Sequence, residues 1–454
     1  MAVSPGASVR KAAVAGMFYP GAAQRLAEEV AEYLDNVEQL EPRLAHPKAL
    51  IVPHAGYLYS GQTAARAYDE LAPARGIVRR VVLIGPSHYV GGRGLAVPEA
   101  DYFETPLGHV PVDRAAIASL ADLPQVVRSA QAHAQEHSLE VQLPFLQRVL
   151  GEFSLVPIAA GAATREEVAQ VLERLWGGPE TLIVISTDLS HYHPYEEARR
   201  IDGATLARIQ ACATDLDHDE ACGATGLNGL LSLCREKGLR VRLLEACNSG
   251  DTAGGKDRVV GYSAFALDDG ASPTPEEAGG VLLEIARGAI ANGLGLSSVP
   301  VKRNHLPWLL RPAATFVTLL REGRLRGCMG SLAPARPLSQ DVASNARAAA
   351  FEDPRFPKLS RDEWPRCAVE VSLLSAAKPI HFGDEAELLE KIQPGVDGLI
   401  LEHEGRRATY LPQVWADMPD KRQFLASLLQ KAGLPADTRL ARCRVSRYRV
   451  AKFA

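Results

Sequence analysis

The sequence predicts two consecutive domains, an α/β domain with a largely parallel sheet followed by a smaller α+β domain. The 454 residues exceed what one hydrophobic core usually organises. Short apolar runs alternate with helical patterns over the first part of the chain, as in layered α/β proteins. A stretch rich in Gly, Ser, Pro and Asp then follows at 268–275 and is typical of a linker. We therefore expect domains at 8–268 and 275–454.

The strands of the first domain are predicted from nearly continuous apolar runs, which suit strands buried on both faces of a sheet. Helical patterns separate these runs, so we expect crossover connections and a parallel arrangement. The predicted strands are 49–52, 81–84, 155–158, 182–185 and 241–244, and the predicted helices are 22–36, 165–175 and 195–210.

The second domain is predicted to open with a helix directly after the linker. Thr274 is the expected N-cap, Pro275 suits the first helical position, and Glu276 and Glu277 follow in the first turn. A mixture of further elements indicates an α+β domain, with strands at 314–320, 369–374 and 398–402 and helices at 340–350 and 421–432.

Composition narrows the class of protein. Hydrophobic residues make up 46% and charged residues 23%, and the formal net charge of −4 offers no basic footprint for nucleic acid. The sequence shows neither an apolar run long enough to span a membrane nor a signal-peptide pattern at Met1. Seven cysteines without a C-x-x-C pair favour reduced thiols. We expect a cytoplasmic protein that binds neither nucleic acid nor membrane.

Polar side chains follow four of the predicted strands of the first domain, where eight of the twelve histidines lie between residues 46 and 193. Ligands of open α/β sheets bind outside the carboxyl ends of the strands, and parallel strands bring these ends to one edge. We therefore expect the following residues to converge in one cleft: His54, His88, Asp188, His191 and Cys247.

The chemistry of this set favours a metal centre. Two imidazoles and one anionic ligand, here His54, His88 and Cys247, suit a catalytic divalent metal with open positions left for substrate. Non-haem iron commonly takes two histidines and a carboxylate, whereas a thiolate in the third place also suits zinc or copper. Asp188 and His191 would then act as acid/base or orienting groups beside the metal.

A competing pattern lies at 133–137, where His133, Glu136 and His137 match the H-x-x-E-H spacing of inverted zinc peptidases on a predicted helix. Matches of this length arise often by chance. His137 can face the cleft from this helix even without that activity, because its neighbours are unusually polar. We therefore count His137 with Asp188 and His191 as a candidate catalytic residue.

Residues 8–268 resemble the Memo family, which is related to the LigB-like class III extradiol dioxygenases. The resemblance rests on collinear segments at 15–20 (AGMFYP), 53–57 (PHAGY), 85–88 (GPSH), 136–140 (EHSLE), 186–191 (STDLSH) and 248–251 (NSGD). It implies a metal site at His54, His88 and Cys247, lined by Asp188 and His191. The third iron ligand of the dioxygenases is a glutamate, so ring cleavage does not follow from the fold.

Residues 275–454 resemble the AMMECR-type domain through 325–330 (LRGCMG), 350–356 (AFEDPRF), 369–372 (VEVS) and 411–415 (LPQVW). The two domains together look like a fusion of two parts of the AmmeMemoRadiSam system, which implies a radical-SAM protein as partner. Arg326, Gly327 and Cys328 are a candidate ligand loop, because glycines on both sides of a cysteine allow close approach to a ligand. The alternative is a tight turn with a buried cysteine.

Three functions compete at this point. The leading hypothesis is a dioxygenase-like, metal-dependent oxidoreductase that acts on a small organic substrate, with iron as the favoured metal and zinc or copper as alternatives. A second is a non-catalytic scaffold that holds a metal or peptide for a radical-SAM partner. A third is a zinc hydrolase, which rests on the shorter H-x-x-E-H match.

Overall fold

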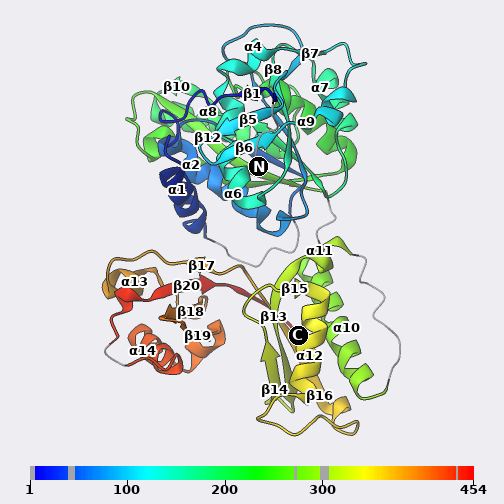
Figure 1. Cartoon of the computed structure of the whole chain (residues 1–454), viewed down its shortest axis with the longest axis vertical. Helices are drawn as coiled ribbons and strands as arrows, with labels where there is room; N and C mark the ends of the chain where they lie inside the picture. The colour runs from blue at the N-terminus through cyan, green and yellow to red at the C-terminus, as the bar shows by residue number, and fades with distance from the viewer. Residues whose placement is uncertain (1–5, 39–45, 270–272, 297–305, 436–437) are drawn as a thin grey trace. The chain divides into compact units, whose positions relative to one another are not determined.

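The computed structural model describes residues 6–38, 46–269, 273–296, 306–435 and 438–454. The chain divides into two compact units (Figure 1). The first unit comprises residues 1–37 and 45–272, and the second comprises residues 38–44 and 273–454. Residues 270–272 of the predicted linker lie outside the described residues.

A nine-stranded sheet forms the centre of the first unit, in the order β10-β12-β2-β9-β3-β8-β4-β7, with β11 also paired to β12. Its middle strands β2, β9, β3 and β8 are parallel neighbours, and almost all of their residues are buried. The largely parallel sheet predicted from their apolar runs is therefore confirmed. The strands are β2 (Ala49–Val52), β3 (Arg80–Pro86), β4 (Leu95–Val97), β7 (Val126–Arg128), β8 (Ser154–Ala160), β9 (Thr181–Ser186), β10 (His191–His193), β11 (Arg240–Asn248) and β12 (Val259–Asp268).

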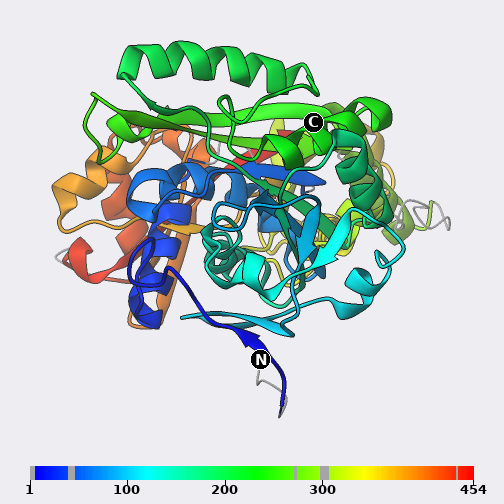
Figure 2. The ribbon, with the colours of Figure 1, turned by 90° about the horizontal axis from the view of Figure 1, so that it is seen from above.

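Helices cover both faces of this sheet. Helix α2 (Tyr57–Tyr68) packs against β2, β11 and β12, with α1 (Ala23–Asp35) and α6 (Leu143–Leu150) outside it. Helix α9 (Ala224–Lys237) packs against β3 and β9 beside α7 (Arg165–Arg174), and α8 (Tyr195–Gln210) lies over β11 and β12 (Figure 2). The smaller elements are β1 (Val9–Arg10), β5 (Tyr102–Thr105), β6 (Gly108–Pro111), α3 (Arg114–Ala118), α4 (Ala130–Ala134), α5 (His137–Glu140), η1 (Asp69–Ala74) and η2 (Ser249–Asp251).

The second unit is α+β, as predicted, and consists of two lobes. In one lobe, α10 and α12 pack against a five-stranded antiparallel sheet of β13, β14, β15, β16 and β21. In the other, a four-stranded antiparallel sheet of β17, β18, β19 and β20 shares a core with helix α14. The elements are α10 (Pro275–Gly293), α11 (Pro307–Leu310), β13 (Pro312–Arg321), β14 (Arg324–Gly330), β15 (Arg336–Pro337), α12 (Leu338–Phe351), η3 (Trp364–Arg366), β16 (Cys367–Leu374), β17 (Lys378–Pro379), α13 (Glu385–Lys391), β18 (Gly398–His403), β19 (Arg406–Tyr410), η4 (Pro412–Ala416), α14 (Lys421–Lys431), η5 (Leu440–Arg442), β20 (Arg444–Tyr448) and β21 (Val450–Phe453).

The start of α10 confirms the predicted helix signal. The Thr274 hydroxyl accepts the backbone N–H of Glu277, and the Glu277 carboxylate accepts the N–H of Thr274. This reciprocal capping box satisfies two backbone donors that the helix itself leaves without partners.

Two local predictions differ from the structure. The segment 132–137 is not one helix, because α4 ends at Ala134 and α5 begins at His137. Residues 326–328 lie within strand β14 and not in a loop. In both places side-chain packing and sheet pairing decide a geometry that local patterns do not specify.

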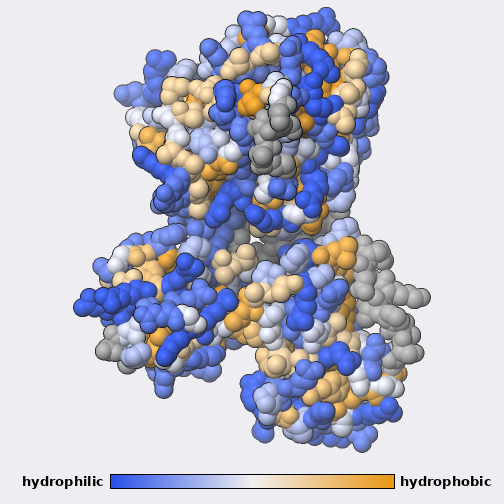
Figure 3. All heavy atoms as spheres, viewed as in Figure 1, coloured by the Kyte–Doolittle hydropathy of each residue, from blue (hydrophilic) through white to orange (hydrophobic). Residues whose placement is uncertain are grey.

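The visible face of the molecule is mostly hydrophilic, with apolar residues in small groups (Figure 3). Among the helices that the structure describes, none has the length and apolar character needed to cross a membrane.

Candidate metal centre

His54 follows strand β2 and is almost fully buried, with 2% of its surface exposed. Its Nδ1 lies 2.9 Å from the Ser186 hydroxyl oxygen. That hydroxyl donates its only hydrogen to the carbonyl of Ser138 and accepts an N–H of Gln142, so it has no hydrogen left for His54. Nδ1 of His54 must therefore carry the proton, which leaves a lone pair on Nε2. Burial lowers the pKa of His54 well below its usual value and keeps the ring neutral.

His88 follows strand β3 and is oriented by a buried carboxylate. Its Nδ1 lies 2.9 Å from Glu136 Oε1, and its backbone N–H donates to Oε2 of the same residue. Burial alone would raise the pKa of Glu136, but hydrogen bonds from His88 and Ser138 lower this pKa to about 2. An ionised carboxylate accepts the Nδ1 hydrogen and again leaves Nε2 with its lone pair. This is the usual arrangement behind a metal-ligating histidine.

The sulfur beside these two histidines belongs to Cys222, which the sequence analysis did not select. Its Sγ lies 3.3 Å from Nε2 of His54, and one ligand atom from each of His54, His88 and Cys222 lies within 4.8 Å of the others. Among the described residues, Cys247 does not join this group.

The loop that carries Cys222 is held against the end of β9. The Cys222 N–H donates to the carbonyl of Asp188, and the N–H of Gly223 donates to the Thr187 hydroxyl. A Cβ at position 223 would lie 2.7 Å from the carbonyl oxygen of Ser186, so only glycine allows this approach. A cysteine followed by a glycine ahead of a helix is the local signal that could have identified Cys222, and the sequence analysis did not use it.

The donor set fits a metal ion. A metal that holds an imidazole nitrogen at about 2.1 Å and a thiolate at about 2.3 Å sets the two atoms about 3.6 Å apart in tetrahedral geometry. The observed 3.3 Å between His54 Nε2 and Cys222 Sγ is close to that separation. Burial and the nearby Asp188 raise the pKa of Cys222 to about 12, so without a cation the thiol keeps its proton.

Two further ionisable groups line the centre. Asp188 accepts the backbone N–H of His54, and its other oxygen lies 3.9 Å from His54 Nε2. Burial raises the pKa of Asp188 above its usual value. His137 stacks on His88 with ring centroids 4.6 Å apart, and its buried Nδ1 lies 3.6 Å from Glu136 Oε1 without forming a hydrogen bond to any described residue. Burial and His88 lower the pKa of His137, so this ring is neutral near pH 7.

The two other predicted residues take different places. His191 lies in β10 and exerts an electrostatic effect on Asp188, but within the described part of the chain no hydrogen bond joins the two. The Cys247 sulfur lies 3.1 Å from the Thr63 hydroxyl on helix α2. Because β12 separates β11 from β2, the strand of Cys247 lies two inter-strand spacings, about 10 Å, from that of His54.

The H-x-x-E-H match does not form a zinc-peptidase site. His133 is buried, and its Nε2 lies 2.9 Å from the carbonyl of Ala96, away from the groups around His137. The break between α4 and α5 removes the helical turn that would place both histidines on one face.

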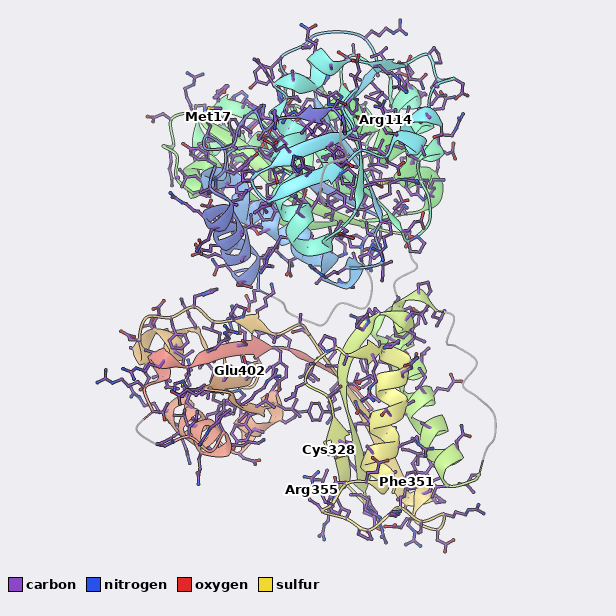
Figure 4. The ribbon with its side chains drawn as sticks, viewed as in Figure 1. Met17, Arg114, Cys328, Phe351, Arg355 and Glu402 are labelled. Carbon is purple, nitrogen blue, oxygen red and sulfur yellow. The ribbon has the colours of Figure 1, made fainter. Side chains whose placement is uncertain are left out.

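The candidate ligand segment of the second unit is a network of paired charges beside Cys328 (Figure 4 labels Cys328 and Arg355). The Arg326 guanidinium donates to both carboxylate oxygens of Glu363 at 3.0 and 2.9 Å, and Arg355 pairs with Asp353 at 2.7 Å. That carboxylate also accepts the Cys328 N–H. A Cβ at Gly327 would lie 2.1 Å from the carbonyl oxygen of Ala349, so this glycine admits helix α12 and not a ligand.

Comparison with known proteins agrees with both halves of this architecture. The Memo-like protein family profile matches residues 10–266, and the AMMECR1 profile matches residues 283–453. A MEMO1 family protein of Aquifex aeolicus is 38% identical over 271 residues, which cover 56% of this chain and 97% of that protein. A MEMO1 family protein of Thermotoga maritima is also 38% identical, over 279 residues covering 57% and 99%.

Among solved structures, an uncharacterized protein of Pyrococcus horikoshii, PH0010, is 34% identical. The match covers 38% of this chain and 89% of that one, with a TM-score of 0.36. The profile of the first unit spans more than half of the chain, and that of the second spans most of the remainder. The chain therefore belongs to the Memo family and joins a Memo domain to an AMMECR1 domain.

Proposed function

We propose that the Memo domain is a metal-dependent oxidoreductase that acts on a small organic substrate at His54, His88 and Cys222. The observation that carries the proposal is the convergence of two imidazole lone pairs with one thiol sulfur at the carboxyl ends of parallel strands. Each imidazole is fixed in the tautomer that a metal requires. Iron is the favoured metal, and when bound it would supply one-electron chemistry and activation of an oxidant.

The residues around this set would handle protons and exclude water. His137 is a neutral imidazole beside His88 whose Nδ1 lies 3.6 Å from Glu136 Oε1, so its other ring nitrogen, Nε2, is the one suited to accept a proton from a substrate hydroxyl. Asp188 has a raised pKa and faces Nε2 of His54, so it can hold a proton near the reacting centre. His191 in β10 acts electrostatically on Asp188 and is a further candidate for moving protons.

Anaerobic purification followed by elemental analysis tests the proposal. We expect iron near one atom per chain in the unaltered protein, and loss of that iron in His54→Ala, His88→Ala and Cys222→Ser. Folding is checked by circular dichroism, because a collapsed variant would also lose metal. Zinc in place of iron would favour hydrolysis or a structural role. Full metal occupancy in a variant that combines all three substitutions would contradict the assignment of the ligands.

We also propose that a radical-SAM protein is the partner of this chain. The support for this part of the proposal is the fusion of the Memo and AMMECR1 domains. We expect a radical-SAM protein of the same organism to bind the purified chain in size-exclusion chromatography under anaerobic conditions. If binding of the partner requires both domains in one chain, co-elution should be lost when the two domains are supplied as separate chains. Elution of the two proteins as independent species would contradict this part.

A further inference from the structure

A groove of about 690 Å³ runs along helix α1 beside the metal centre. Its walls are residues 16–22, one face of α1 and the exposed Leu58 at the start of α2. Phe18 lines the groove, and its ring centroid lies 4.8 Å from that of His137. Because His137 stacks on His88, the groove lies two side chains away from a proposed metal ligand.

The wall formed by residues 14–19 is held rigidly in place. The fully buried Glu140 carboxylate accepts the backbone N–H of Val14 and the hydroxyl of Tyr19, at 3.0 and 2.6 Å. The carbonyl of Phe18 accepts the N–H of Tyr57 at 2.8 Å. This segment is therefore preformed, which reduces the entropy that a bound partner must give up.

One end of the groove is apolar and open to solvent. Met17 is 74% exposed and Leu58 is 67% exposed, and both line the groove (Figure 4 labels Met17). Local disorder does not explain this exposure, because the Met17 N–H donates to the carbonyl of Val14 at 3.1 Å. Large apolar side chains held in water beside a groove are typical of a docking surface.

The other end is acidic. Arg25, Glu29 and Glu32 line the groove at helical spacing, while Leu26 and Val30 face the core and are fully buried. Neither glutamate forms an ion pair with a described residue, and two carboxylates outnumber the single guanidinium. The lining of this face therefore carries a net negative charge, and a cationic group seated here would gain electrostatic energy.

The groove is long enough to hold a short extended chain. From Arg25 to Asn36 the helical wall spans about 16 Å, at about 1.5 Å per residue. An extended peptide covers that distance with about five residues. We propose that this groove binds a basic, extended segment of a partner protein. An apolar side chain of that segment lies against Met17 and Leu58, and a Lys or Arg lies against Glu29 and Glu32.

Arrays of short peptides of randomised sequence, probed with the labelled full-length chain, test this proposal. We expect enrichment of peptides that carry Lys or Arg a few residues from Leu, Met or Phe. The best peptide should bind Glu29→Gln/Glu32→Gln about tenfold more weakly and lose most of its salt dependence. Met17→Ala/Leu58→Ala should weaken binding by a similar factor at every salt concentration.

The matched control is Glu28→Gln/Glu236→Gln, which changes the net charge equally on exposed residues that do not line the groove. Equal losses in the control and in Glu29→Gln/Glu32→Gln would overturn the proposal, as would an array without basic enrichment. Competition by free spermidine as strong as that by the peptide would assign the groove to small cations and would also overturn it. Binding is measured with and without metal and in His54→Ala, where it should persist, so the proposal stands or fails separately from the metal centre.

Discussion

The metal centre of the Memo domain and the β14 segment of the AMMECR1 domain both place a cysteine among ionisable residues, yet their electrostatics differ. In the Memo domain the lone pairs of His54 and His88 and the sulfur of Cys222 face one another. His54 is buried, Cys222 is partly buried and His88 is exposed, and the polar Nδ1 of His137 beside them forms no hydrogen bond with a described residue. Buried polar atoms of this kind cost folding free energy unless something binds to them.

In the β14 segment opposite charges are paired, although Nη1 of Arg326 forms no hydrogen bond within the described residues. Arg326 is bound by Glu363, and Arg355 by Asp353, which also fixes the backbone of Cys328. Hydrogen bonds from Arg326 lower the pKa of Glu363 to about 2, as expected for a carboxylate in a stable ion pair. A cysteine among charged residues therefore indicates a metal or catalytic site where potential ligand atoms converge without ion-pair partners. It indicates a structural role where the neighbouring charges are paired with one another.

The largest expected effect separates Cys222 from Cys247 of the Memo domain. Cys222→Ser should weaken metal binding by more than about hundredfold, because losing a ligand exceeds the usual effect of losing a residue behind one. Cys247→Ser should bind metal like the unaltered protein, since its sulfur contacts Thr63. Metal content after dialysis against a graded chelator measures both. If Cys247→Ser lost metal and Cys222→Ser retained it, the ligand set would be His54, His88 and Cys247, as expected from the strand ends.

A smaller effect is expected behind His88. Glu136→Gln removes the negative charge that accepts the Nδ1 hydrogen and should weaken metal binding by about 10–100-fold. The same chelator titration measures it, with the solvent-exposed Glu166→Gln on α7 as the matched control. An unchanged affinity would mean that the ring of His88 keeps its orientation without this carboxylate.

The paired charges of the AMMECR1 domain should affect stability and not metal content. Glu363→Gln leaves the buried Arg326 without its counter-charge and should lower the free energy of unfolding by about 1–3 kcal/mol. Urea unfolding followed by tryptophan fluorescence measures this, because three of the four tryptophans lie in this domain. The exposed Glu404→Gln should change stability by less than about 0.5 kcal/mol.

The smallest expected effect is the pH dependence of this ion pair. The folded pKa of Glu363 is about 2, below its ordinary 4.5, so its contribution to stability is complete above about pH 4.5 and is lost as the pH falls toward 2. Urea midpoints measured between these limits should fall more steeply for the unaltered protein than for Glu363→Gln. Parallel pH profiles would show that the carboxylate has the same pKa in the folded and unfolded chain.

Much of the Memo domain could be predicted from local patterns. Runs such as 182–185 contain only apolar residues, and burial on both faces of a parallel sheet is the arrangement that accommodates them. The ends of β2 and β3 then place His54 and His88 at one edge, because parallel strands share a direction. The capping box at Thr274 is equally local, since its two hydrogen bonds span only three residues.

The third proposed ligand, the sulfur of Cys222, could not be predicted from local patterns. Cys247 ends a strand that runs in the same direction as β2, but β12 lies between the two strands, and the sulfur that groups with His54 and His88 is that of Cys222. Pairing order within a sheet depends on contacts between residues distant in sequence, and no local pattern specifies it.

The sequence by itself determined the principal strands of the parallel sheet, the first helix of the second domain, and which two imidazoles meet at the sheet edge. Those features follow from hydrophobic periodicity and capping, which act over a few residues. Only the tertiary structure decided that Cys222 approaches His54, because the approach requires Gly223 to pack against the end of β9. It also decided that the charges around Cys328 are paired, since Arg326 and Glu363 lie 37 residues apart and meet only when the lobe has folded.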